Sequence, residues 1–148
     1  MQLAELKIAI IGSDSFDSLE FHLKDELNIQ GNETQIFDYI KGIHKPTTVI
    51  YPRAKNLASN LIGEDGSVAI RICKDPFCKT LIKQFGKPIV STSANISGLP
   101  TPMCFSDISL DIIEGVDYVV RSEQDDTTLK EPSAIVKWEQ DQIIIIRS

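Results

Sequence analysis

The sequence predicts an α/β (α+β) fold, with one twisted mixed sheet and flanking helices. Three observations support this prediction. Apolar runs rich in β-branched residues alternate with segments in which apolar residues recur every three or four positions, as expected of strands and amphipathic helices. The last strand-like segments follow one another directly, as in antiparallel hairpins. A length of 148 residues suits one hydrophobic core better than two, so we expect a single domain over residues 1–148.

The first part of the chain contains two predicted strands and three predicted helices. LKIAII and TTVIY are short β-rich runs, and prolines bound the second run on both sides. Elsewhere apolar residues recur at helical spacing, and Gly42 and Gly63 stand where a helix would end. We therefore expect strands at 6–11 and 47–51 and helices at 15–28, 33–41 and 54–62.

The second part adds two helices and five strands. Asp75 and Pro76 form a helix start, because an aspartate caps free N–H groups and proline suits the first turn. Gly86 would end this helix, and Ser106 is the expected cap of the next one. We expect helices at 77–85 and 107–114 and strands at 67–72, 87–91, 117–121, 133–138 and 142–147.

Composition and motifs exclude several functional classes. The formal net charge is −6, which argues against a surface that grips nucleic acid as a whole, although a local basic groove stays open. Three cysteines without CxxC spacing and two histidines predict neither a disulfide framework nor a metal site. GxSxG, GxxxxGK[ST] and HExxH motifs are absent, and no catalytic residue is identifiable. Without a signal segment or an apolar run of about 20 residues, we expect a cytoplasmic protein.

A cluster of small polar residues, STSANISG at 91–98, follows the predicted strand 87–91. Small side chains let a ligand approach the backbone, and hydroxyls and amides supply donors to phosphate or carboxylate oxygens. The same composition also suits a turn held by local bonds between side chains and backbone. Composition alone leaves both interpretations open.

The order of segments resembles the YrdC-like family. STSANISGLPTP is similar to the family's TSAN-type signature with SG and a following proline. KPTTVIYP resembles its proline-led PxT strand, SVAIRI a strand that ends in arginine, and EPSAIV with IIIIR its closing PST-type and arginine elements. The resemblance covers roughly residues 45–148, and it implies the fold of a single YrdC-like domain.

The resemblance implies the activity of the threonylcarbamoyl-AMP synthases, a nucleotidyltransferase activity if the groove is complete. These enzymes condense L-threonine, bicarbonate and ATP into threonylcarbamoyl-AMP and diphosphate, usually with Mg²⁺ on the nucleotide, for N6-threonylcarbamoyladenosine formation in tRNA. It also implies an ATP- and threonine-binding groove lined by Thr48, Arg71, Ser91, Ser93, Asn95, Ser133 and Arg147. The alternative is a non-catalytic module that binds a nucleotide, tRNA or double-stranded RNA, against which the net acidity counts.

One part of the family pattern has no match in this sequence. Family members normally begin with a PTxTxYG-type strand and a KxR element, whereas the first strand here is LKIAII. We therefore expect a YrdC-like domain that lacks the family's N-terminal third and, with it, a lysine and an arginine of the groove. A sheet without that segment would expose an unpaired edge, so we also expect a homodimer through this edge.

Overall fold

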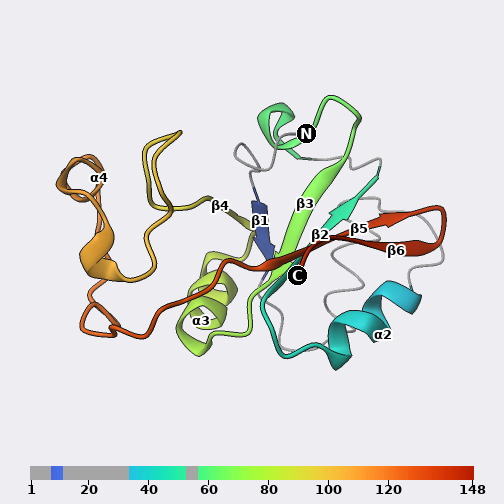
Figure 1. Ribbon diagram of the computed structural model, residues 1–148, viewed down its shortest axis with the longest axis horizontal. Coiled ribbons are helices and arrows are strands. Elements are labelled where there is room, and N and C mark those ends of the chain that lie inside the picture. Colours follow the sequence, from blue (N-terminus) through green and yellow to red (C-terminus); the bar gives the residue numbers. More distant parts are fainter. Residues whose placement is uncertain (1–7, 12–33, 53–56) are drawn as a thin grey trace.

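The computed structural model describes residues 8–11, 34–52 and 57–148. Within them, six strands form one sheet in the order β4-β1-β3-β2-β5-β6 (Figure 1). The β1–β3 and β2–β5 pairs are parallel and the other three are antiparallel, which confirms the predicted mixed sheet. The strands are β1 Ile8–Ile11, β2 Thr47–Tyr51, β3 Val68–Ile72, β4 Ile89–Ser91, β5 Ala134–Glu139 and β6 Gln142–Arg147.

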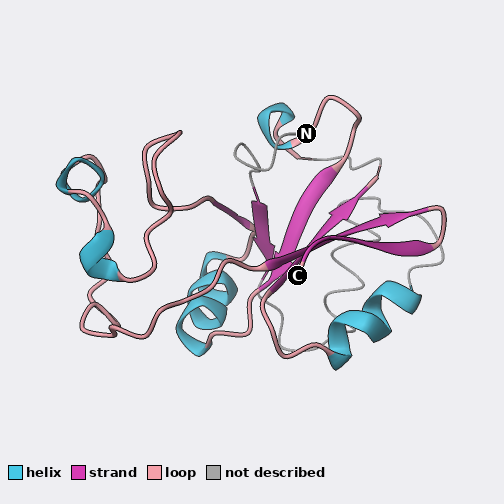
Figure 2. Cartoon of the chain, viewed as in Figure 1, coloured by secondary structure: helices cyan, strands magenta, loops and turns pink. Residues whose placement is uncertain are grey.

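Helices lie beside this sheet and in its connections (Figure 2). Those described are α2 Thr34–Gly42, α3 Pro76–Phe85 and α4 Leu110–Glu114, with short 3₁₀ helices at Ser59–Leu61 and Phe105–Asp107. The helix predicted at 15–28 lies outside the described residues. The connection from β4 to β5 carries α4 and extends to one side of the sheet (Figure 1).

One face of the sheet carries the main hydrophobic core. Ile36 and Ile40 of α2 pack there against alternate residues of three strands, β2, β3 and β5. The two-residue period of a strand places these residues on one face, and the helical period of α2 presents both isoleucines together. The strand residues of this cluster are Val49, Tyr51, Val68, Ile70, Val136 and Trp138.

The opposite face carries a row of residues in register across four strands. Thr48 of β2 pairs with Arg71 of β3 and with Ile135 of β5, and Ile135 pairs with Arg147 of β6. Ile135 is opposite Arg147, while the next residue of β5, Val136, is opposite Ile145, so one residue of β6 forms a bulge. The bulge brings Arg147 into the row of Arg71 and Thr48.

Local signals in the sequence account for several boundaries. The Asp75 carboxylate accepts a hydrogen bond of 2.8 Å from the Cys78 backbone N–H, and Gly86 ends α3 with φ of +71°. Gln140 and Asp141 connect β5 to β6 with φ of +51° and +57°, the conformation that closes two-residue hairpins. The predicted helix start at Asp75 and the closing hairpin are therefore confirmed.

Three predicted elements differ from the structure. Residues 117–121 form no strand, because they lie in the long connection between α4 and β5, where no neighbouring strand is available. The predicted helix 107–114 is divided: the Asp107 carboxylate accepts from the Met103 and Cys104 N–H groups, and α4 starts after Ser109 rather than after Ser106. In the described part of 54–62 there is only a 3₁₀ turn.

Truncation of Ile36, the fully buried side chain of α2, should destabilise the fold. Ile36 is 0% exposed, so Ile36→Ala should lower the free energy of unfolding by about 3 kcal/mol through lost burial and a cavity. Urea titration followed by circular dichroism measures this change. Leu110→Ala is the control, since Leu110 is 70% exposed and its truncation should cost less than about 0.5 kcal/mol. Equal losses would contradict a core centred on α2.

Candidate functional site

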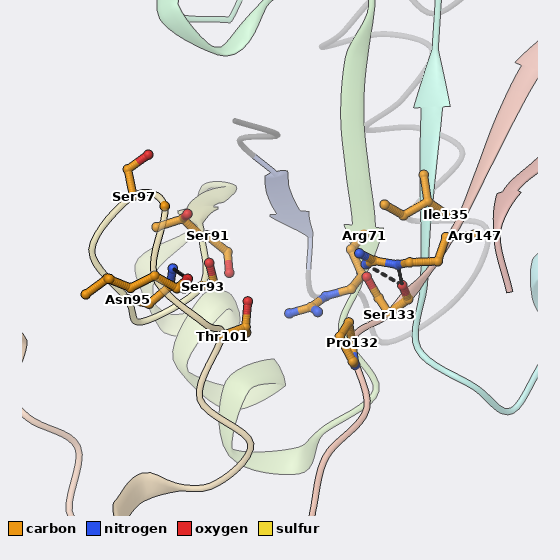
Figure 3. A pocket seen from close by; sticks show the side chains of 13 residues that line it. Arg71, Ser91, Ser93, Asn95, Ser97, Thr101, Pro132, Ser133, Ile135 and Arg147 are labelled. Atoms are coloured by element: carbon orange, nitrogen blue, oxygen red, sulfur yellow. Dashed lines mark hydrogen bonds between the residues drawn. The ribbon is translucent and has the colours of Figure 1, made fainter. Parts of the chain in front are cut away.

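A cleft of about 520 Å³ opens on the face of the sheet that carries Arg71 (Figure 3). One wall is the polar loop that follows β4, from Ser91 to Thr101, and the other is the start of β5 with the end of β6. Arg71 extends from β3 into the space between these walls (Figure 3). Six of the seven residues predicted for the groove line this cleft: Arg71, Ser91, Ser93, Asn95, Ser133 and Arg147.

The two arginines give the cleft its charge. Arg147 is fixed in place, because its Nε and one terminal nitrogen donate to the Ser133 carbonyl oxygen at 3.1 and 2.7 Å. Both arginine residues are half-buried, and the lining that the described residues form contains no carboxylate. Within the described residues, neither arginine forms an ion pair. A half-buried cation without a partner favours an anionic ligand.

Thr48, the seventh predicted residue, lies beneath the cleft rather than in its lining. Its side chain is 0% exposed, and its hydroxyl is 2.9 Å from the Ser133 hydroxyl. Thr48 therefore positions Ser133, which in turn holds Arg147 through its carbonyl oxygen. This chain of bonds joins β2, the start of β5 and the end of β6.

Asn95 shapes the polar loop from within. Its amide nitrogen donates to the carbonyl oxygens of Ile96 and Leu99 at 3.1 and 3.0 Å. A rotated amide would place its oxygen against both carbonyls, so this orientation is the only favourable one. The amide oxygen is buried without a partner. Asn95 thus holds the shape of the loop through its two donors, and its oxygen has no partner among the described residues.

A turn at Gly98 completes the loop. The Leu99 N–H donates to the Ile96 carbonyl at 3.0 Å, and Gly98 between them has φ of +85°. A side chain at this position would be strained by the backbone angle, although the space around it is open. The turn therefore explains why glycine occupies this position of the SG motif.

Some lining residues were not predicted for the groove. Ser97 and Thr101 add two more hydroxyls to the loop wall, and Pro132 and Ile135 add apolar surface to the other. Ser97 belongs to the run of small polar residues at 91–98, whose composition could have predicted it, and Thr101 lies three residues beyond the end of that run. Pro132 precedes Ser133 in the EPSAIV segment.

The described residues provide no protein cage for a metal ion. No group of three or more histidine, cysteine, aspartate or glutamate side chains among them is placed to hold one. The described cysteines are free thiols outside the cleft lining. No described helix has the length and apolar character to cross a membrane.

Fold and site together define an α/β protein with a cationic cleft lined by hydroxyl groups. The chain belongs to the Sua5/YciO/YrdC family, described as telomere recombination, whose pattern matches residues 10–148. A threonylcarbamoyl-AMP synthase from Enterobacter sp. (strain 638) is 31% identical over 111 residues, which cover 75% of this chain and 57% of the relative. The chain spans about half the length of the curated relatives it matches.

Solved structures show the same fold at low sequence identity. A variant of P. abyssi Sua5 matches with a TM-score of 0.72 at 20% identity, covering 95% of this chain and 40% of that one. E. coli YciO matches with a TM-score of 0.70 at 17% identity, covering 95% of this chain and 65% of that one. These matches confirm the predicted YrdC-like fold.

Removal of the buried hydroxyl beneath the cleft should destabilise the chain. Thr48→Val preserves the shape of the side chain but leaves the Ser133 hydroxyl without this partner, so we expect a loss of about 1–3 kcal/mol in the free energy of unfolding. Urea titration measures the loss. Thr127→Val, at an exposed position, is the control and should change stability by less than about 0.5 kcal/mol. A neutral Thr48→Val would show that the bond contributes nothing.

The thiol at the start of α3 should be unreactive. Burial and the neighbouring Asp75 carboxylate raise the pKa of Cys78 to about 12. At pH 8 only about one thiol in 10⁴ is then a thiolate, and alkylation proceeds through the thiolate. Peptide mapping after iodoacetamide treatment should show Cys78 modified far more slowly in the folded chain than in guanidinium chloride. Equal rates in the two conditions would contradict the raised pKa.

Proposed function

We propose that the chain is a nucleotidyltransferase of the threonylcarbamoyl-AMP synthase type that binds ATP and L-threonine in the cleft. The observation that carries this proposal is the pair Arg71 and Arg147 opposite the hydroxyl-rich loop, in a member of this family. Two guanidinium groups without carboxylate partners suit anions, and the substrates supply phosphates and a carboxylate. The matched relative is itself a threonylcarbamoyl-AMP synthase.

The proposed reaction needs positioning and charge stabilisation more than covalent help. Bicarbonate and the threonine amine give a carbamate with loss of water. A carbamate oxygen then attacks the α-phosphorus of ATP, the bond from that phosphorus to the bridging oxygen breaks, and diphosphate leaves. Guanidinium groups and hydroxyls held around the α-phosphate would stabilise the charge that develops on its oxygens. The product would then serve N6-threonylcarbamoyladenosine formation in tRNA.

The cleft residues would have different roles in binding the substrates. Arg71 projects between the walls and would contact phosphate or carboxylate oxygens directly. Ser91 and Ser93 would donate hydroxyl hydrogens to phosphate oxygens from the loop wall. Arg147 retains N–H groups that do not bond Ser133, so it can bind an anion without leaving its place. Asn95 would keep the loop wall in the shape that presents these hydroxyls, through its bonds to the Ile96 and Leu99 carbonyl oxygens.

Mg²⁺ would enter this site with the nucleotide. The cleft lining contains hydroxyl, amide and guanidinium groups but no carboxylate, the ligand by which proteins usually bind this ion. The residues present therefore fit an ion that is held mainly by triphosphate oxygens and water. Bound in that way, it would offset phosphate charge near the two arginines.

Replacement of Arg71 should weaken nucleotide binding and slow turnover. Arg71→Met keeps much of the apolar stem but removes a charge-assisted contact of about 1.5–3 kcal/mol, so ATP affinity should fall about 10- to 100-fold. Calorimetry with Mg·ATP measures the affinity. Release of diphosphate from ATP, threonine and bicarbonate measures turnover, and omission of threonine should stop it. Arg121→Met removes an exposed arginine outside the cleft and should leave both unchanged.

The two measurements separate synthesis from binding alone. Nucleotide binding that depends on Arg71, without threonine-dependent diphosphate release at high protein concentration, would support the non-catalytic module instead. Absence of both would overturn the proposed function of the cleft.

A further inference from the structure

The last strand forms an unusual edge of the sheet. β6 lies at one end of the strand order and pairs with β5 alone among the described strands (Figure 1). It contains four consecutive isoleucines without a charge between Gln142 and Arg147. Ile144, Ile145 and Ile146 are 41%, 65% and 43% exposed. In an antiparallel ladder the hydrogen-bonding groups of alternate residues point away from the neighbour, so the outer side of β6 offers donors and acceptors that no described strand pairs with.

The two ends of the sheet are protected differently. β4, at the other end, has only three residues, and a short strand gives an incoming strand little to pair with. β6 has six residues and carries neither lysine nor proline, the usual protection of an edge. Its one irregularity is the bulge that precedes Arg147. The regular part, residues 142–145, is therefore the segment with which another strand could pair.

The isoleucines extend both faces of the sheet beyond its covered part. Ile143 and Ile145 lie opposite Trp138 and Val136 on the face of α2. Trp138 and Val136 are buried, whereas most of Ile145 is not. Ile144 lies opposite Lys137 and so belongs to the other face. An occupant of this edge must therefore be an extended apolar strand with residues for both faces.

We infer that the outer edge of β6 pairs antiparallel with β6 of a second copy of this chain. A twofold axis perpendicular to the sheet keeps each face continuous, so the pairing is centred on one residue. Centred on Ile144, it places Ile144 opposite itself and Ile143 opposite the second copy's Ile145. The central Ile144 pair and the two Ile143–Ile145 pairs lie in the regular part of the strand and bring no like charges together, and the next pair places Gln142 opposite Ile146, the bulged residue. The second copy is an occupant whose chemistry matches the edge on both faces.

The interface is small, so the dimer should be weak. One strand pair with its flanking isoleucines buries less than the roughly 1,200 Å² of the smallest stable interfaces, and we expect a micromolar or weaker dissociation constant. This inference does not rest on the proposed activity. It is also separate from the dimer predicted from the sequence, which was placed at the edge left by the absent N-terminal segment, whereas this inference rests on β6 itself.

Sedimentation velocity on the full chain tests the pairing. The fraction of dimer in the wild-type chain should rise with concentration up to about 1 mM. At that concentration even a millimolar dissociation constant gives a large dimer fraction. Ile144→Lys and Ile144→Glu should each be monomeric, because both place like charges opposite each other. An equimolar mixture of these two variants should restore the dimer, since lysine then faces glutamate. Leu110→Lys, at a more exposed apolar position on α4, should dimerise like the wild type.

Three results would overturn the inference. A wild-type chain that stays monomeric at about 1 mM has no self-pairing edge of useful strength. A dimer that persists in both single variants uses another surface. Failure of the mixture to restore the dimer, with both variants folded by circular dichroism, would exclude the register centred on Ile144.

Discussion

The hydrogen bond between the Thr48 and Ser133 hydroxyls joins the middle of the sheet to the wall of the candidate site that carries Arg147. Thr48 lies in the middle of β2, in register with Arg71 on one side and Ile135 on the other. Its hydroxyl fixes Ser133, and the Ser133 carbonyl oxygen fixes the Arg147 guanidinium. Loss of either hydroxyl would leave the other buried without its partner, and that would cost more free energy than the bond itself contributes. The two hydroxyls therefore stabilise the structure only together. The position of Arg147 therefore depends on Ser133 and, through it, on this one buried contact.

The sequence predicts the strands well because their patterns and boundaries agree. TTVIY is β-branched and bounded by prolines, and QIIIIR follows a turn that closes a hairpin, so both predictions match the observed strands. Residues 117–121 carry the same pattern but lie where no strand can pair with them. A strand is stabilised by a neighbour distant in sequence, and a local pattern contains no information about that neighbour.

The site was predicted in its residues more than in its geometry. Motif resemblance named Arg71, Ser133 and Arg147, and the structure brings them to one cleft. Strict alternation along β6 would put Arg147 on the α2 face with Ile145, and only the bulge returns it to the face of Arg71. Asn95 shows the same limit. Its type indicates hydrogen bonding, but only the folded loop reveals that its donors are used within the loop and its oxygen is left over.

The positive charge of the described cleft lining is too small to neutralise a nucleoside triphosphate by itself. The lining supplies two guanidinium groups and otherwise neutral donors, whereas a bound triphosphate carries several negative charges. Neutral hydroxyls orient phosphate oxygens but offset little of their charge, because net charge must be balanced by cations. Nucleotide binding in this cleft should therefore depend strongly on a divalent ion that travels with the nucleotide. Arg147 donates its hydrogen bonds to a neutral carbonyl oxygen, that of Ser133, and so keeps its net charge for a ligand. A carboxylate in the same place would cancel half of the positive charge of the described cleft lining.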